Sequence, residues 1–148
     1  MRNSTIGAAA AVFLTAGSAM SLPVHAAEAQ PVSAQETAAH AAAVQRHINA
    51  YRARDLDAFT ATFAPDAIVV ANGIPARGRA QIRSFYAANF APDAPTVRVN
   101  ASYMSDDGGS RRLYMETAYI LSDGQEMCCS QTFYTVKNGL ITRLDVTS

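Results

Sequence analysis

Residues 45–70, QRHINAYRARDLDAFTATFAPDAIVV, predict two helices that lead into a β-strand. Asp55 is a natural N-cap for the second helix, because its carboxylate can accept a hydrogen bond from a free backbone N–H group. The apolar face of this helix is expected to consist of Leu56, Phe59 and Phe63. Pro65 is expected to end the helix. The apolar run at residues 67–71 then has the length of a buried strand.

Upstream of this stretch, Ser33-Ala34-Gln35-Glu36 matches a capping box and predicts a first helix that begins at Ala34. Its face toward the protein would carry His40, Val44, His47, Ile48 and Tyr51. Downstream, residues 72–75 are expected to form a loop, and a third helix is expected after Gly78. The apolar face of the third helix would carry Ile82, Phe85, Tyr86 and Phe90.

After Pro95 the spacing of apolar residues changes from a helical period to a period of two, which indicates strands. The predicted strands cover residues 96–104, 111–121, 126–136 and 140–147. The segments between them contain Asp-Gly or Asn-Gly pairs, which are strong hairpin signals. Helices followed by an antiparallel meander predict an α+β fold, with the N-terminal helices packed on the sheet.

The length of 148 residues and the hydrophobic content of 49% fit one domain with a sizeable core. Residues 1–26 are expected to be a cleaved signal peptide, with an apolar run at residues 6–20 and a Val24-His25-Ala26 cleavage pattern. The run is shorter than the roughly 20 residues of a membrane span, so an uncleaved anchor is the weaker alternative. We therefore expect residues 27–148 to form a periplasmic or secreted domain without a stable membrane span.

The chain has 12 basic and 12 acidic residues, and the two signs are interspersed. Nucleic acids and anionic membranes are usually bound by surfaces of concentrated positive charge. We interpret the basic pair Arg111-Arg112 as the solvated start of a strand. The sequence therefore predicts no nucleic-acid partner.

Cys128 and Cys129 are the two cysteines of the chain. Side chains of neighbouring strand residues point to opposite faces, and a bridge between adjacent cysteines requires a distorted peptide. We therefore expect no disulfide within the chain, with Cys129 facing inward and Cys128 facing outward. A bridge between two chains remains an alternative.

Several segments resemble the NTF2-like superfamily, in particular its SnoaL-like and ketosteroid-isomerase-like branch. The segments that carry this resemblance are residues 45–46, 54–59, 63–67, 78, 82–86 and 138–141. The resemblance covers residues 27–148 and implies a strongly curved sheet wrapped around helices into a cone with one open pocket. Homodimers formed through the outer face of the sheet are common in this superfamily, so a homodimer is a candidate assembly here.

The resemblance also allows a test of the isomerase mechanism, in which an Asp base works with a Tyr and a protonated Asp that stabilise an oxyanion. In this sequence the tyrosine position is His47, the base position is Ala71 and the protonated-Asp position is Gln131. A methyl group cannot move a proton between carbon atoms, so the familiar steroid isomerisation is disfavoured. Tyr86 matches a tyrosine that hydrogen-bonds the oxyanion donor in the isomerase.

We expect a small-molecule pocket in which apolar walls carry a few polar groups. His47 would be its hydrogen-bonding or acid–base group, with Tyr86 fixing the tautomer and Gln131 binding a carbonyl or hydroxyl. A histidine that is simply satisfied in the core is the alternative. Odd-numbered residues of the strand at 126–136 are expected to face the pocket. The expected ligand-binding residues are His47, Tyr51, Tyr86, Met115, Cys129, Gln131, Phe133 and Leu144.

His40 and His47 lie about 10 Å apart along a helix, too far to share an ion, so no metal and no cofactor is expected. The leading hypothesis is an exported protein that binds a small, largely apolar molecule. One alternative is an isomerase, cyclase or hydratase that uses His47 as its acid–base group. Another is a dimeric interaction module whose cavity is filled by its own side chains. A pocket of roughly 300 Å³ or more would favour a ligand over the module.

Overall fold

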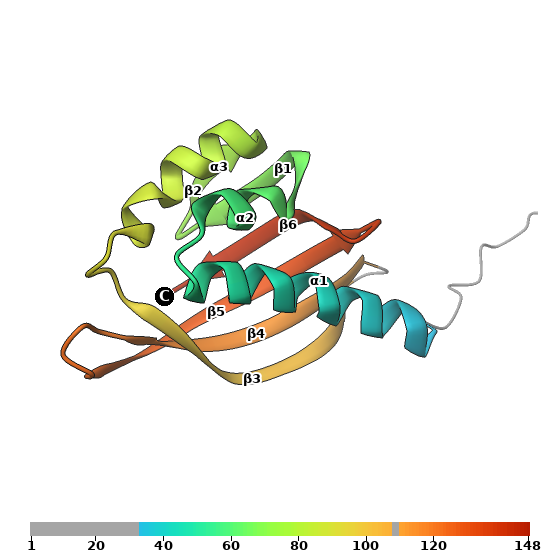
Figure 1. The fold of residues 1–148 in the computed structure, drawn as a ribbon. Coiled ribbons are helices and arrows are strands. Elements are labelled where there is room, and N and C mark those ends of the chain that lie inside the picture. Colours follow the sequence, from blue (N-terminus) through green and yellow to red (C-terminus); the bar gives the residue numbers. More distant parts are fainter. Residues whose placement is uncertain (1–32, 108–109) are drawn as a thin grey trace, which may run out of the picture.

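A computed structural model of the protein describes residues 33–107 and 110–148 (Figure 1). The predicted signal peptide, residues 1–26, and half of the turn at residues 106–109 lie outside the described residues. The described helices are α1 (Ala34–Arg52), α2 (Leu56–Ala61), α3 (Gly78–Tyr86) and the short 3-10 helix η1 (Ala87–Phe90). The described strands are β1 (Phe63–Ala71), β2 (Ile74–Arg77), β3 (Thr96–Asp107), β4 (Ser110–Ile120), β5 (Glu126–Lys137) and β6 (Leu140–Thr147).

The described strands form a sheet in the order β2-β1-β6-β5-β4-β3. β1 runs parallel to β6, and the other neighbouring strands are antiparallel. β3 to β6 therefore form the predicted meander, and α1 crosses its concave face (Figure 1). The predicted α+β class is confirmed. No described helix combines the length and the apolar character that a membrane span requires.

Both predicted helix caps are present. Glu36 N donates a hydrogen bond to Ser33 Oγ over 3.1 Å, and Ser33 N donates one to the Glu36 carboxylate over 3.2 Å, which completes the capping box. Ala58 N donates to the Asp55 carboxylate over 2.8 Å at the start of α2. These bonds satisfy backbone N–H groups that have no partner within the helix, so both helices begin where the sequence predicts.

The boundary between α2 and β1 differs from the prediction. α2 ends at Ala61, and Phe63 belongs to β1 rather than to the helix. The cause is a tertiary contact, because Ile141 N of β6 donates a hydrogen bond to the Thr62 carbonyl over 2.9 Å. Pro65 lies inside β1, where the pairing with β6 is irregular and a missing N–H group is tolerated.

Residues 72–75, predicted as a loop, contain a tight turn and the start of β2. Asn72 and Gly73 have positive φ angles of 48° and 82°. A two-residue turn with positive φ at both positions matches the twist of antiparallel strands, so it favours a hairpin. β2 accordingly begins at Ile74 and pairs with β1.

Irregular pairing across β3, β4 and β5 bends these strands. In β3 the register shifts at Asn100. In β5 it shifts at Cys128 and Cys129, which together oppose Ala118 of β4. An extra residue in one strand bends that strand and increases its twist. The bend is visible in β3 and β4 (Figure 1) and helps to give the sheet its concave face.

Cys128 and Cys129 form a disulfide across a cis peptide bond, so the prediction of no disulfide within the chain was wrong. That prediction assumed regular alternation of side chains along the strand, which the bulge removes at these two residues. The bulge also changes which later residues of β5 face inward. The buried residues that follow it are Ser130, Thr132, Tyr134 and Val136.

The core lies between the helices and the concave face of the sheet. Phe59 of α2 and Phe63 of β1 are fully buried, with ring centroids 5.5 Å apart. Ile82 of α3 and Leu144 of β6 are also buried. Removing a side chain of this size from water contributes roughly 1.5–3 kcal/mol. Val44 and Ile48 of α1 are buried in the same core, which holds α1 over the sheet and places His47 in the interior.

Candidate functional site

A cavity lies between α1, η1 and the concave face of the sheet. It has a volume of about 60 Å³ and is partly open to solvent. Its apolar and aromatic lining consists of Ile48, Tyr51, Phe59, Tyr86, Val97, Tyr119, Tyr134, Leu144 and Val146. Its other lining residues are His47, Asn89, Thr117, Ser130 and Thr132. The exposed residue Asn89 indicates that the opening lies beside η1.

His47 uses one ring nitrogen within the protein and presents the other to the cavity. Nδ1 lies 2.9 Å from Thr62 Oγ1. The Thr62 hydroxyl donates its own proton to the Phe59 carbonyl over 2.6 Å, so it accepts the hydrogen bond from His47. Nδ1 therefore carries the ring proton. Nε2 makes no hydrogen bond to a described residue and is accessible from the cavity, where it offers a lone pair.

Burial keeps the His47 ring neutral. The residue is 4% exposed, and its ring centroid lies 4.3 Å from that of Phe59, 5.1 Å from that of Phe63 and 5.6 Å from that of Tyr134. Loss of hydration in these surroundings lowers the pKa of His47 from 6.5 to about 3. At neutral pH the imidazole is therefore uncharged, and it is a weak base.

The tyrosines of the cavity are neutral as well. Burial raises the pKa values of Tyr51, Tyr86 and Tyr134 above the ordinary tyrosine value, so their hydroxyls keep their protons. The described lining contains no carboxylate, lysine or arginine. The cavity as described is therefore a neutral site with several hydrogen-bonding groups.

The structure brings part of the predicted site together. The predicted residues that line the cavity are His47, Tyr51, Tyr86 and Leu144. Met115 is buried on the inner face of β4 but lies outside the lining. Cys129, Gln131 and Phe133 lie on the opposite face of β5, so the expectation that odd-numbered residues face the pocket was wrong. The bulge causes this difference, because a shift of one residue exchanges the two faces of a strand.

Sequence reasoning missed several residues of the lining: Asn89, Thr117, Tyr119, Ser130, Thr132 and Tyr134. For Ser130, Thr132 and Tyr134 the signal was the pair of adjacent cysteines, because a bulge at that pair turns the even-numbered positions of β5 inward. The expected partner of His47 was also wrong, because Thr62 rather than Tyr86 fixes its tautomer. Thr62 precedes a strand of another part of the fold, and no local pattern pairs it with His47.

The chemistry of the described cavity differs from that of the isomerase. Ala71, at the base position, ends β1 and lies outside the lining. The described lining has no carboxylate, so none of its residues supplies a carboxylate base in place of the missing Asp. Its donor atoms are one imidazole nitrogen, an amide and hydroxyl groups. This set does not correspond to the three or four nitrogen, sulfur or carboxylate ligands of a zinc centre.

Comparison with known proteins assigns the chain to a family. Residues 44–144 match the family model of the SnoaL-like domain, and the chain belongs to this family. No curated protein matches it. Among solved structures, a candidate polyketide cyclase from Sinorhizobium meliloti is 24% identical, with a TM-score of 0.56. That match covers 72% of this chain and 94% of the cyclase chain.

Two further solved structures have the same fold. An NTF2-like protein of unknown function from Mesorhizobium loti is 15% identical, with a TM-score of 0.63 over 79% of this chain and 94% of its own. A protein with a ketosteroid isomerase-like fold from Catenulispora acidiphila, determined in complex with trimethylamine, is 20% identical. Its TM-score is 0.58 over 72% of this chain and 84% of its own. These similarities confirm the NTF2-like cone that the resemblance implied.

Protonation of His47 is expected to destabilise the fold as the pH falls. Its folded-state pKa of about 3 lies below the reference value of 6.5, so the unfolded chain binds the proton more readily. The contribution of the neutral His47 ring to the unfolding free energy is fully present above pH 6.5, and it is lost as the pH falls from 6.5 toward 3. Between pH 7 and pH 5 we expect His47 to account for a loss of about 2 kcal/mol in unfolding free energy, measured by urea denaturation.

His47→Gln removes the titrating ring and is expected to lose this part of the pH dependence. His40→Gln is the matched control, because His40 lies on the same helix but outside the cavity. The control retains His47 and should therefore keep the part of the pH dependence that comes from His47. The same slope in His47→Gln and in the wild type would contradict a buried, neutral His47.

Proposed function

We propose that the protein binds a small uncharged molecule in the cavity between α1, η1 and the concave face of the sheet. The neutrality of the described lining carries this proposal. Apolar walls with a few fixed hydrogen-bonding groups are the usual composition of a small-molecule site. A charged ligand would lose its hydration there without meeting an opposite charge among the described lining residues.

The size of the cavity limits the ligand that fits without movement of the protein. Its volume of about 60 Å³ is smaller than that of an engineered cavity of roughly 150 Å³ that binds benzene. It is also below the roughly 300 Å³ of sites for drug-sized ligands, so for a ligand of that size, such as a steroid, the volume favours the alternative of a module filled by its own side chains unless the cavity widens. The Catenulispora acidiphila protein was determined in complex with trimethylamine, which supports a ligand of only a few atoms in respect of size.

The tautomer of His47 adds a requirement for the ligand. Nε2 presents a lone pair to the cavity and has no hydrogen-bond partner among the described residues. A ligand with a hydroxyl or N–H group can donate a hydrogen bond to this atom. A ketone or an ether of the same size offers only acceptors and leaves Nε2 unpaired, at a cost of about 1 kcal/mol or more. The preferred ligand therefore resembles a small alcohol more than a small ketone.

Catalysis receives less support than binding. An isomerase, cyclase or hydratase built on His47 would require this ring to exchange protons near neutral pH. General acids and bases work best when their pKa lies near the operating pH, and the pKa of His47 is about 3. The similarity to a candidate polyketide cyclase concerns the fold and supplies no acid–base group. We therefore favour a binding protein.

In this proposal the protein binds its ligand outside the cytoplasm. Residues 1–26 have the pattern of an export signal. The disulfide between Cys128 and Cys129 supports export, because disulfides persist mainly in oxidising compartments. These two observations favour a periplasmic or secreted location.

A ligand of this size would be lost during purification, so the test is a titration. Short-chain alcohols and ketones of equal length are added to labelled protein, and the shifts of the backbone amide signals are followed by NMR. We expect saturable shifts at residues around the cavity, with alcohols binding about five-fold more tightly than the matching ketones. No saturable shift with any compound of either series would contradict the proposal.

Two variants locate the binding site. Val146→Phe adds a ring to the cavity wall and is expected to abolish the shifts. Thr147→Phe adds the same ring at the next, exposed position of β6 and should preserve binding. Binding that survives Val146→Phe would place the ligand elsewhere.

We also propose that the protein forms homodimers through the outer face of β3 to β6. An aromatic row crosses this face, with ring centroids 4.5 Å apart for Tyr103 and Tyr114 and 5.2 Å apart for Tyr114 and Phe133. Tyr103 is 56% exposed. Exposed aromatic residues of this kind are enriched at protein interfaces.

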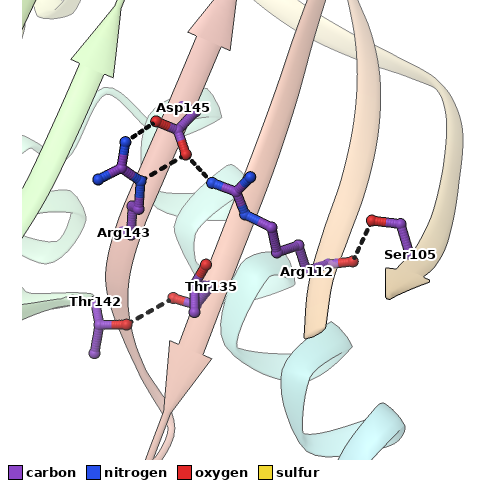
Figure 2. A network of polar contacts seen from close by, with 6 residues as sticks. All are labelled: Ser105, Arg112, Thr135, Thr142, Arg143 and Asp145. Carbon is purple, nitrogen blue, oxygen red and sulfur yellow. Dashed lines mark hydrogen bonds and ion pairs between the residues drawn. The ribbon is translucent and has the colours of Figure 1, made fainter. Parts of the chain in front are cut away.

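Charged residues of both signs surround the row. Asp145 forms ion pairs with Arg112 and Arg143 on the side of the sheet opposite α1 (Figure 2). Arg112 also lies over the Phe133 ring, 5.5 Å from its centroid. Mixed charges around an apolar centre suit a two-fold interface, in which each surface must complement itself.

Sedimentation velocity tests this assembly. We expect a dimer for the wild type and a monomer for Tyr103→Lys, because the added charges would face each other across the two-fold axis. Ser122→Lys places the same charge on an exposed turn and should leave the dimer intact. A monomeric wild type at tens of micromolar would contradict the proposal.

A further inference from the structure

A cluster of metal-ligating side chains lies at the bend of the sheet. Among the described residues, Glu116, Cys128 and Cys129 bring a carboxylate oxygen and two sulfur atoms within 4.8 Å of one another. Cys128 is exposed, and the other two residues are partly exposed. Asn100 Nδ2 lies 3.3 Å from Glu116 Oε1 and 3.4 Å from Cys129 Sγ. The register shifts of β3 and β5 thus bring these four residues together.

The cluster is separate from the cavity. Glu116 lies between Met115 and Thr117, which are both buried on the inner face of β4. Successive side chains of a strand point to opposite faces, so the Glu116 carboxylate projects from the outer face. None of the four cluster residues lines the cavity. The cluster is therefore a second candidate site.

We propose that reduction of the disulfide converts this cluster into a binding site for a thiophilic divalent cation such as Zn²⁺. Thiolate sulfur binds zinc at about 2.3 Å and carboxylate oxygen at about 2.0–2.2 Å. Two atoms bound to one ion at these lengths lie no more than about 4.6 Å apart. The three ligand atoms already lie within 4.8 Å of one another in the oxidised chain. Once the bond between the two sulfur atoms is broken they can separate, so side-chain movements bring all three ligand atoms around one ion.

Glu116 is oriented for this role by its neighbour. The Asn100 amide donates a hydrogen bond to one carboxylate oxygen, which leaves the second oxygen available for an ion. Groups that hold a ligand in this way usually strengthen metal binding by about 10- to 100-fold. With three protein ligands, a tetrahedral ion keeps one position for water or an external ligand.

The oxidation state of the two cysteines controls the site. In the disulfide the sulfur atoms are bonded to each other and cannot act as thiolate ligands. Reduction transfers two electrons and two protons from an external dithiol, which becomes a disulfide itself. Binding of Zn²⁺ then displaces the two thiol protons. The cation is bound by the reduced chain and released when an external disulfide accepts two electrons from the two cysteines, becomes a dithiol and restores the Cys128–Cys129 bond.

Competition between the full chain and a chromophoric chelator for Zn²⁺ tests the proposal. The chain is reduced with dithiothreitol, freed of it without oxygen, and compared with the oxidised chain. We expect one Zn²⁺ per reduced chain and at least a 100-fold weaker affinity in the oxidised chain. Cys128→Ser and Cys129→Ser should each lose most of the affinity of the reduced chain, and Glu116→Gln should lose at least about 10-fold.

Glu126→Gln is the matched control, because Glu126 lies on β5 close in sequence to the cysteines but pairs with Arg98 outside the cluster. It should bind Zn²⁺ as the wild type does. Equal affinities of the reduced and oxidised wild type would overturn the proposal, and this comparison needs no substitution. Full affinity in Glu116→Gln would also overturn the site as described.

Discussion

The hydrogen bond from His47 to Thr62 is the interaction on which the cavity depends. Thr62 accepts from Nδ1 and donates to the Phe59 carbonyl, so the direction of both bonds is fixed. The surrounding aromatic rings then remove water from the imidazole and keep it neutral. In the neutral ring Nε2 can accept a hydrogen bond from an uncharged ligand, whereas a charged ring would attract anions.

The bend of the sheet determines which residues reach this ring. The extra residues in β3 and β5 curve these strands around α1. The extra residue in β5 also determines which face of the sheet each residue after Cys129 occupies. Ser130 and Thr132 turn toward the cavity, while Glu116 and the cysteines gather on the outside. These two irregularities of the backbone thus help to give the two faces of the sheet different chemistry.

Local sequence signals predicted most elements of the fold. The predictions that were wrong concern residues whose position depends on contacts with distant parts of the chain or on the bulge in β5. The capping box at Ser33 and the cap at Asp55 are local bonds, so α1 and α2 begin as predicted. Helical spacing correctly placed His47 on the inner face of α1. Phe63 was misplaced because its state depends on pairing with distant β6. Gln131 was misplaced because the bulge before it exchanges the faces of β5.

The protonation of the His47 ring tests the central claim most directly. Nitrogen-15 NMR of the imidazole distinguishes the two neutral tautomers and the imidazolium by the chemical shifts of the two ring nitrogens. A proton on Nδ1 and a bare Nε2, unchanged between pH 8 and pH 5, is the expected result. A proton on Nε2, or an imidazolium that forms near pH 6.5, would contradict the account of a neutral cavity.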